Sequence, residues 1–186
     1  MYLPNKIVIT GTSGCGKTFL GKRFTKLFGR GSIDLDDLYW LPNWSPRADE
    51  EFYSLIQQKI SSDAWIICGN YSRAKQAVWE QADMIIWLDL PFSTCLWRAF
   101  KRSIIRWITH ESCCNGNYET LGRLFWKNSI LLWIWKTYNR RKEAYSEYFN
   151  HHKDQHKLIR LQNSKQVDEF MMKLQRCTRP DMQSCN

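Results

Sequence analysis

The stretch "KIVITGTSGCGKT", residues 6–18, decides the fold of this chain. Its β-branched run, residues 7–10, is bounded by Gly11 and predicts a short strand. Residues 18–28 carry apolar side chains at helical spacing and are followed by Gly29, which predicts a helix. The loop between them, residues 11–18, matches the pattern G-x-x-x-x-G-K-[ST] between a strand and a helix, which is the context of a phosphate-binding loop.

The residue types of this loop suit the binding of a nucleotide. Glycines allow backbone N–H groups to turn toward phosphate oxygens, and the N-terminus of the following helix adds a favourable dipole. We expect Lys17 to contact the β- and γ-phosphates and to act in catalysis, and the Thr18 hydroxyl to bind Mg²⁺. Cys15 is expected to be a small filler of the loop. The predicted cofactors are ATP and Mg²⁺, and the predicted nucleotide-binding residues are Gly11, Thr12, Ser13, Gly14, Cys15, Gly16, Lys17 and Thr18.

The composition is that of a soluble globular protein. The chain has 186 residues, of which 44% are hydrophobic and 24% charged, so we expect one domain over residues 1–175 and a loosely held tail over 176–186. No apolar run reaches the ~18 residues of a membrane span, and no signal peptide is visible. Seven scattered cysteines indicate a reducing compartment, which we expect to be the cytoplasm.

The remaining elements alternate along the chain. Apolar runs predict strands, and apolar side chains at helical spacing predict helices. An alternation of strands and helices implies an α/β fold with a parallel sheet covered on both faces. The predicted strands lie near residues 32–36, 64–70, 83–91 and 156–161, and the predicted helices near 52–60, 92–108, 118–149 and 167–174.

Five blocks of the chain carry a family resemblance: "GTSGCGKT" (11–18), "DLDDLYW" (34–40), "WIICGNYSR" (65–73), "LDLPFSTCLWRAFKR" (88–102) and "NGNYETLGRLFWKNSILLW" (115–133). Together they resemble the P-loop kinases related to adenylate kinase, and among these the bacterial group described as topology modulation proteins. The resemblance implies a P-loop NTPase fold with a five-stranded parallel sheet, helices on both faces and a helical lid region near 107–117, followed by a long helix over 118–149. It also implies an ATP site at the loop and an acceptor site beside it.

Two acidic residues follow the second predicted strand. Asp34 and Asp36 are two residues apart, so on an extended strand their side chains would face the same side. A carboxylate here can accept the proton of an acceptor hydroxyl or orient it for in-line attack. We expect Asp36 to be catalytic and to bind the acceptor, and Asp34 to assist in binding Mg²⁺. The alternative is a solvated acidic loop or a helix N-cap.

The acceptor site is predicted from neighbouring blocks. Tyr39 and Trp40 could line an acceptor pocket by stacking or belong to the core. The resemblance places Arg73 in the same site. Many nucleoside monophosphate kinases carry an aspartate at the end of the third strand, where this chain has Cys68. We therefore expect Asp34 to supply the missing carboxylate, which makes a nucleoside monophosphate a less secure acceptor.

Arginines follow at a helical spacing. Arg98, Arg102 and Arg106 are spaced by four and share one face of a helix. Arginine donates planar, forked hydrogen bonds that stabilise the charge of a transferring phosphoryl group. The resemblance places Arg98 and Arg102 at the opening of the lid and Arg141 on the helix beyond it, so we expect these three to be catalytic. The alternative is a solvated basic face.

The aromatic segment from residue 121 to 138 has two apolar stripes, formed by Leu121, Leu124, Phe125, Leu131, Leu132, Trp135 and Tyr138 and by Trp126, Ile130, Trp133 and Ile134. One stripe suffices for packing on the core, so the second predicts a self-association face and a homodimer. The interleaved basic residues would equally fit a membrane surface or a DNA backbone.

Two functions compete for this sequence. The favoured one is an ATP-dependent phosphotransferase for a small acceptor, such as a nucleotide or nucleoside. The alternative is a P-loop protein that binds DNA, or regulates its topology, without efficient kinase activity. The net charge of +9 suits both, since nucleotides and DNA are polyanionic. Asp34, Asp36 and the lid-like arginines favour the kinase, because a simple DNA-binding module needs neither.

Overall fold

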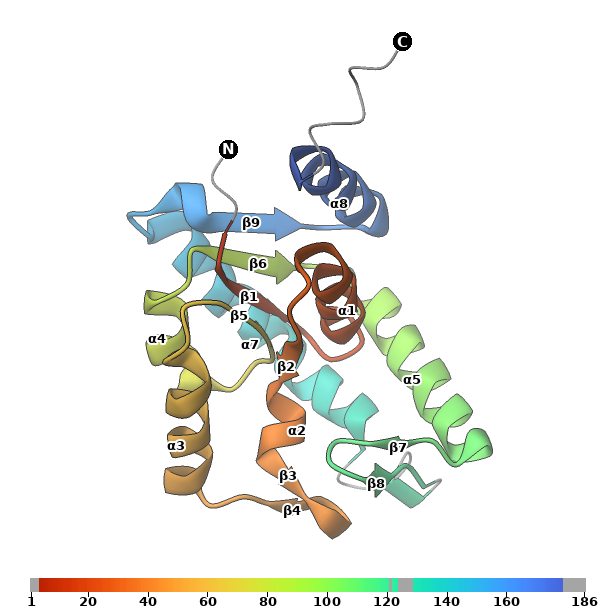
Figure 1. Ribbon diagram of the computed structural model, residues 1–186. Helices are drawn as coiled ribbons and strands as arrows, with labels where there is room; N and C mark the ends of the chain where they lie inside the picture. The colour runs from red at the N-terminus through yellow and green to blue at the C-terminus, as the bar shows by residue number, and fades with distance from the viewer. Residues whose placement is uncertain (1–3, 121, 124–128, 179–186) are drawn as a thin grey trace.

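The computed structural model of the chain describes residues 4–120, 122–123 and 129–178. Its centre is a five-stranded parallel sheet, which confirms the predicted fold class (Figure 1). The strands, in spatial order, are β2 (Ser32–Asp34), β5 (Trp65–Cys68), β1 (Lys6–Gly11), β6 (Met84–Leu88) and β9 (Leu158–Leu161). The chain crosses from β1 to one side first and to the other side later, so the carboxyl end of β1 is the switch point where open α/β sheets bind their ligands.

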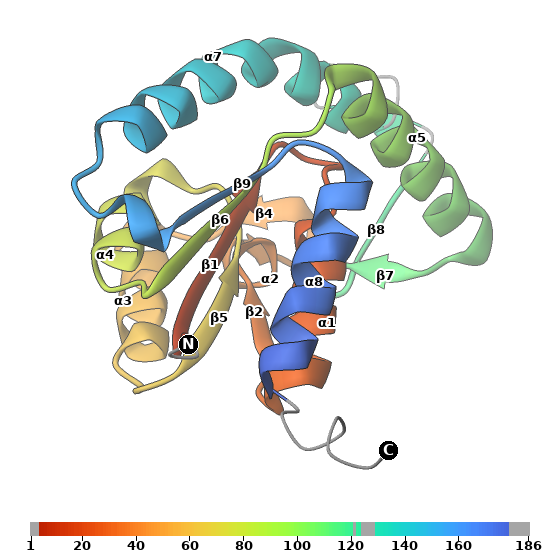
Figure 2. The same ribbon diagram turned by 90° about the horizontal axis from the view of Figure 1, so that it is seen from above.

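Helices cover both faces of this sheet (Figure 2). The helices, in chain order, are α1 (Lys17–Phe28), α2 (Leu35–Tyr39), α3 (Asp49–Ile60), α4 (Ser72–Glu80), α5 (Phe92–Thr109), α7 (Ile130–His151) and α8 (Ser164–Thr178), with short 3₁₀ turns η1 (Pro42–Trp44) and η2 (Gln155–Lys157). Two antiparallel ribbons lie outside the sheet, β3 (Trp40–Leu41) with β4 (Ser45–Pro46), and β7 (Ser112–Cys113) with β8 (Asn117–Tyr118). No helix among the described residues is both long and apolar enough to cross a membrane.

The alternation of side chains along the strands divides the core in two. Ile7 and Ile9 of β1 point to the face covered by α1, α5 and α8, whereas Val8 points to the face covered by α3, α4 and α7. All three side chains are buried, so β1 is apolar on both faces, as expected of the central strand of a parallel sheet. This double burial fixes the position of the loop that follows β1.

One predicted boundary is wrong. The helix expected over residues 118–149 is α7, which begins at Ile130. Two local features explain the later start: Asn117–Tyr118 pairs as β8 with β7, and the Ser129 hydroxyl accepts a hydrogen bond from Leu131 N at 3.2 Å as an N-cap. The predicted stripe residues at positions 121 and 124–126 lie outside the described residues.

Candidate active site

The loop predicted to bind phosphate joins β1 to α1 at the switch point of the sheet. Gly14 and Gly16 have φ angles of 83° and 102°, a region that favours glycine. A Cβ on Gly14 would lie 2.1 Å from the carbonyl oxygen of Cys95, so a side chain there would collide with backbone. Cys15 is buried and burial raises the pKa of its thiol, which suits a packing role.

The Lys17 side chain folds across this loop. Its Nζ donates hydrogen bonds to the carbonyl oxygens of Gly11 and Thr12 at 2.9 and 3.2 Å. An ammonium group has three donors, so these two bonds orient the charge and leave a third donor for an anion. The N-terminus of α1 lies beside it, because Lys17 is the first residue of that helix. The position of Lys17 therefore suits contact with phosphate.

The Thr18 hydroxyl binds a carboxylate from the neighbouring strand. Thr18 Oγ1 donates to Asp34 Oδ2 at 2.7 Å. The other oxygen of Asp34 accepts a hydrogen bond from the backbone N–H of Asp36 at 3.1 Å and caps α2. Burial raises the pKa of Asp34, and the nearby charge of Asp36 acts in the same direction. The structure thus brings together the two residues predicted to hold Mg²⁺, as a pair of oxygen ligands of the kind this ion prefers.

Asp36 differs from the prediction in its backbone. It does not lie on an extended strand; β2 ends at Asp34, and Asp36 is the second residue of α2. The reason is the Asp34 cap, which starts a helix immediately after the strand. The two carboxylates remain neighbours all the same. Tyr71 Oη donates to Asp36 Oδ1 at 2.7 Å, and burial with the charge of Asp36 raises the pKa of Tyr71.

Tyr39 and Trp40, which follow Asp36 in the chain, were expected either to line an acceptor pocket or to belong to the core. The Tyr39 ring lies 4.8 Å from Tyr71 and 5.2 Å from Phe52, measured between centroids, and packs against the core. Trp40 packs edge-on against Trp44 at 5.7 Å, on the ribbon that projects from the sheet. Tyr39 therefore packs with the core, while Trp40 packs with Tyr39 and Trp44 at the start of the β3–β4 ribbon.

The end of β5 carries the Cys68 thiol and no carboxylate, as the sequence shows. Cys68 Sγ is buried and donates weakly to the Lys17 carbonyl oxygen at 3.6 Å. Burial raises the pKa of this thiol. A Cβ on Gly21 would lie 2.6 Å from this sulfur, so α1 packs on it closely. Cys68 thus acts as a packing residue, and the carboxylate in contact with Thr18 comes from Asp34.

The three arginines predicted to be catalytic differ in their contacts. Arg98 Nη2 donates to Ser164 Oγ at 2.9 Å, and its Nη1 lies 3.9 Å from the position of a Cβ on Gly16. Arg102 Nε and Arg141 Nη1 are buried and, within the described part of the chain, have no hydrogen-bond partner.

Arg141 is described with its side chain, whereas Arg73 is described by its backbone only. Burial lowers the pKa of the Arg141 guanidinium, and the Asp36 carboxylate lies near enough to oppose that shift. Arg73 belongs to α4 by its backbone, and its side chain lies outside the described part of the structure. The described residues therefore place Arg141 near Asp36, whereas the predicted role of Arg73 stays a prediction.

A small hollow lies between the loop and α7. Thr12, Asp89 and Arg141 are among the residues that line it. Asp89 is buried and accepts two hydrogen bonds from Arg160, at 2.6 and 3.0 Å. A carboxylate held by a guanidinium in this way serves the packing of β6 against β9. Thr12 and Arg141 are the residues of the hollow that belong to the predicted site.

The ribbon in the predicted lid region is attached to the opposite ribbon. Asn117 Oδ1 accepts a hydrogen bond from Trp44 N at 2.6 Å, and Asn117 Nδ2 donates to Leu41 O at 3.0 Å. Trp44 Nε1 donates to Tyr118 O at 3.1 Å. The predicted lid region, 107–117, thus comprises the end of α5 and most of the β7–β8 ribbon, which lies beside the residues after α2 (Figure 1).

Sequence reasoning missed Asn70, which holds the start of the loop. Its Oδ1 accepts hydrogen bonds from Thr10 Oγ1 at 2.9 Å and from Gly11 N at 3.1 Å, and its Nδ2 donates to Gly11 O. Tyr145 Oη of α7 lies 3.1 Å from Thr10 Oγ1, within hydrogen-bond distance, and joins the same group. The available signal was weak: a polar residue two positions after a buried strand, at the edge of the sheet where the loop lies.

Replacing Asn70 with alanine should lower the free energy of unfolding by about 1–3 kcal/mol, because the buried Thr10 hydroxyl and the Gly11 amide lose their partners. Urea denaturation measures this change. The matched control is Gln76→Ala, which removes an exposed amide bound to Glu80 at 3.1 Å and should cost no more than about 0.5 kcal/mol. Equal losses in the two variants would contradict the role assigned to Asn70.

Comparison with protein-family models gives no match, and a search of the curated proteins gives none either. Solved structures do match. A shikimate kinase from Acinetobacter baumannii in complex with shikimate has a TM-score of 0.59 and 18% identity, covering 98% of this chain and 96% of that one. A gluconokinase from Sinorhizobium meliloti has a TM-score of 0.54 and 15% identity, covering 97% and 94%.

A shikimate kinase from Bacteroides thetaiotaomicron has a TM-score of 0.51 and 15% identity, covering 94% of this chain and 98% of that one. At these identities the likeness shows the fold alone. The chain has the fold of the small-molecule P-loop kinases. Membership of the topology modulation group stays a prediction.

Proposed function

We propose that this protein is an ATP-dependent phosphotransferase that moves the γ-phosphoryl group of Mg·ATP to a hydroxyl of a small acceptor held near Asp36. One observation carries the proposal: the phosphate loop, the Thr18–Asp34 pair and the Asp36 carboxylate form one continuous group at the switch point of the sheet. A loop that only binds a nucleotide does not need a second, hydrogen-bonded carboxylate beside it.

The nucleotide phosphates are held by the loop and the surrounding cations. The backbone N–H groups at the start of α1 and the Lys17 ammonium would bind the β- and γ-phosphates. Arg102 and Arg141 have buried N–H groups that find no acceptor among the described residues, a state that costs about 1–3 kcal/mol for each group unless an acceptor arrives. Phosphoryl oxygens are the acceptors that a guanidinium binds best, so both groups support an anion site here.

Thr18 and Asp34 are the residues that would hold Mg²⁺. Both offer oxygen atoms, and Mg²⁺ uses few protein ligands besides water and phosphate. When bound, the ion neutralises charge on the phosphate oxygens. The chain's own part is to keep the Thr18 hydroxyl and the Asp34 carboxylate at hydrogen-bond distance from one another before the ligand binds.

Asp36 would receive the proton of the acceptor hydroxyl. Tyr71 holds one oxygen of this carboxylate by a hydrogen bond at 2.7 Å and so fixes its orientation. Oriented in this way, the carboxylate can align a hydroxyl with the γ-phosphate for in-line attack. The printed names of the structural neighbours, gluconokinase and shikimate kinase, make small hydroxylated acids the first acceptors to test.

The deciding experiment measures Mg·ATP turnover with a panel of acceptors. The panel contains gluconate, shikimate, nucleosides and nucleoside monophosphates, with duplex DNA as a separate arm. Turnover that depends strongly on one acceptor and phosphorylates its hydroxyl group supports the proposal and identifies the substrate, whereas transfer to the phosphate of a nucleoside monophosphate would contradict the hydroxyl acceptor. Slow hydrolysis that responds to DNA and to no small acceptor would overturn it in favour of the DNA-binding alternative.

Replacing Asp34 with asparagine should separate activity from stability. Turnover should fall by about 10–100-fold, the usual effect of losing a group that supports a metal site. Since burial raises the pKa of Asp34, its ionised form is less stable in the folded chain than in the unfolded chain. The neutral amide should therefore raise the Tm at neutral pH. This gain should shrink as the pH falls through the raised pKa and vanish below the ordinary aspartate value of about 3.9.

Thermal unfolding monitored at several pH values checks the second half of this prediction. Asp63→Asn, an exposed aspartate outside the site, is the matched control and should leave both Tm and turnover unchanged. A lower Tm for Asp34→Asn at neutral pH would show that the ionised carboxylate stabilises the fold, contrary to the destabilisation expected from its burial.

A further inference from the structure

The exposed apolar side chains are concentrated on two helices. Eleven large hydrophobic side chains are exposed within the described residues, and seven of these lie on α5 or on the first half of α7. On α5, Trp97 and Ile108 are each 63% exposed, and Ile105 is 45% exposed. These residues are eight and three positions apart, which places them on one side of the helix, opposite the buried Cys95 and Ala99. One side of α5 is thus apolar without facing the core.

The first half of α7 continues this surface. Trp135 is 68% exposed and Leu132 is 41% exposed. The Phe92 ring at the start of α5 packs edge-on against Trp135 at 5.6 Å, which joins the two helices. Figure 2 shows α5 and α7 along the outer rim of the molecule, with no other described helix or strand outside them. We define the outer face as Trp97, Lys101 and Ile108 of α5 with Leu132, Trp135 and Lys136 of α7.

The charges of these two segments have one sign. Residues 92–109 contain four arginines or lysines and no acidic residue, and residues 130–142 contain another four and again no acidic residue. Lys101 lies one helical turn after Trp97, and Lys136 one turn after Leu132, and both lysines are exposed. The outer face therefore combines exposed tryptophan, isoleucine and leucine with positive charge only.

The charge pattern decides among three classes of partner. A second copy of this chain would bring like charges together, which opposes association. Duplex DNA would bind the lysines through its phosphates but offers no apolar surface to Trp97, Ile108 and Leu132. An anionic lipid bilayer offers both: tryptophan rings settle at the headgroup level, and lysines bind acidic headgroups.

We propose that the outer face of α5 and α7 binds the surface of an anionic lipid bilayer. The two helices lie on the membrane with Trp97, Ile108 and Leu132 at the headgroup boundary, and Lys101 and Lys136 contact the acidic headgroups. Arg98 and Arg102 project from a different side of α5: Arg98 contacts Ser164 and lies beside Gly16, and Arg102 Nε is buried. Membrane binding is thus independent of the proposed phosphotransfer.

Co-sedimentation of the full chain with vesicles tests this proposal. The vesicles contain phosphatidylcholine alone or phosphatidylcholine with phosphatidylglycerol, and binding is expected only with the acidic lipid and less at high salt. Two double variants separate the contributions, Trp97→Ser with Ile108→Ser and Lys101→Glu with Lys136→Glu. Each should reduce partitioning by at least about tenfold, because each removes two of the groups that bind the bilayer.

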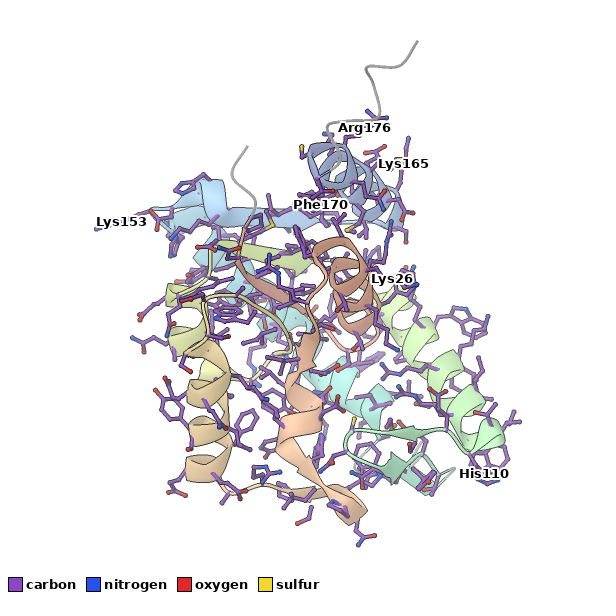
Figure 3. The ribbon with its side chains drawn as sticks, in the orientation of Figure 1. Lys26, His110, Lys153, Lys165, Phe170 and Arg176 are labelled. Carbon is purple, nitrogen blue, oxygen red and sulfur yellow. The ribbon has the colours of Figure 1, made fainter. Side chains whose placement is uncertain are left out.

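The control variants alter exposed residues elsewhere. One control is Met172→Ser, which removes a methionine side chain on α8 that is 48% exposed. Two more controls are Lys26→Glu on α1 and Lys165→Glu on α8, which reverse the charge of lysines labelled in Figure 3. These variants should bind vesicles as the unaltered chain does. Circular dichroism confirms that every variant is folded.

Three results would overturn the proposal. The first is equal binding to neutral and acidic vesicles, and the second is unchanged binding by the Trp97→Ser, Ile108→Ser variant. The third is absence of vesicle binding. If a dimer is then seen in analytical ultracentrifugation and lost in the Trp97→Ser, Ile108→Ser variant, the face belongs to a second copy. If salt-sensitive DNA binding is seen and lost in the Lys101→Glu, Lys136→Glu variant, it belongs to nucleic acid.

Discussion

Replacing Lys17 with alanine should lower kcat for acceptor phosphorylation by about 10²–10³-fold, the usual effect of losing one aligned donor to developing charge. The Lys17 ammonium is held over the loop by the carbonyl oxygens of Gly11 and Thr12, so its charge lies where the β- and γ-phosphates would bind. Alanine removes that charge while the glycine-rich backbone keeps its shape. Steady-state kinetics with the acceptor found in the panel measure the loss.

Lys26→Ala is the matched control, since it removes an exposed lysine from the last turn of the same helix. It should leave kcat unchanged. A second readout is the affinity for ATP, measured by titration calorimetry, which should weaken in Lys17→Ala only. Full activity of Lys17→Ala would show that the loop binds its ligand for another purpose, and the proposed function would then be wrong.

The parts of the site that the sequence predicted are local in the chain. The loop is a short motif between a strand and a helix, and its glycines adopt the backbone that the motif requires. The apolar runs that became β1, β5 and β6 are continuous because both sides of each strand are buried. Such a pattern can be read from the order of the residues alone, so the strands and the edge of the sheet that carries the loop could be predicted from it.

The parts that were missed or misplaced depend on contacts between distant residues. Asn70 lies 60 positions from Thr10, and nothing in its neighbourhood marks an amide that will bind the backbone of Gly11. Asp36 was placed on a strand because alternation was the only pattern available, whereas one capping bond from Asp34 starts a helix there. Capping bonds and buried amides are decided by tertiary packing, which leaves little trace in residue spacing.

The late start of α7 has a similar cause. The apolar spacing after residue 118 suits a helix, yet Asn117 and Tyr118 are held by ribbon β3–β4 and its turn through Trp44. These bonds join segments more than 70 positions apart in the chain. A helical propensity over a few residues is a weak preference that such contacts override.

Replacing Asp36 with asparagine should lower kcat for phosphoryl transfer by about 10²–10⁴-fold, the range expected for loss of a general base. Asparagine has nearly the same shape and still accepts the hydrogen bond that Tyr71 now donates at 2.7 Å. What it loses is the capacity to accept a proton from the acceptor hydroxyl. The affinity for ATP should stay unchanged, because the loop and Lys17 do not contact Asp36. Kinetics with saturating ATP and varied acceptor, together with ATP titration, measure both quantities.

Asp37→Asn is the control that tests the assignment of roles. Asp37 is the next residue in the chain and is exposed, and its replacement by asparagine removes the same charge from the same short helix. If Asp36 is only structural, both variants should leave kcat at a permissive temperature unchanged. If Asp36 accepts the proton, Asp36→Asn alone loses turnover while its Tm changes little. The comparison therefore separates a catalytic carboxylate from a structural one, whichever acceptor the protein uses.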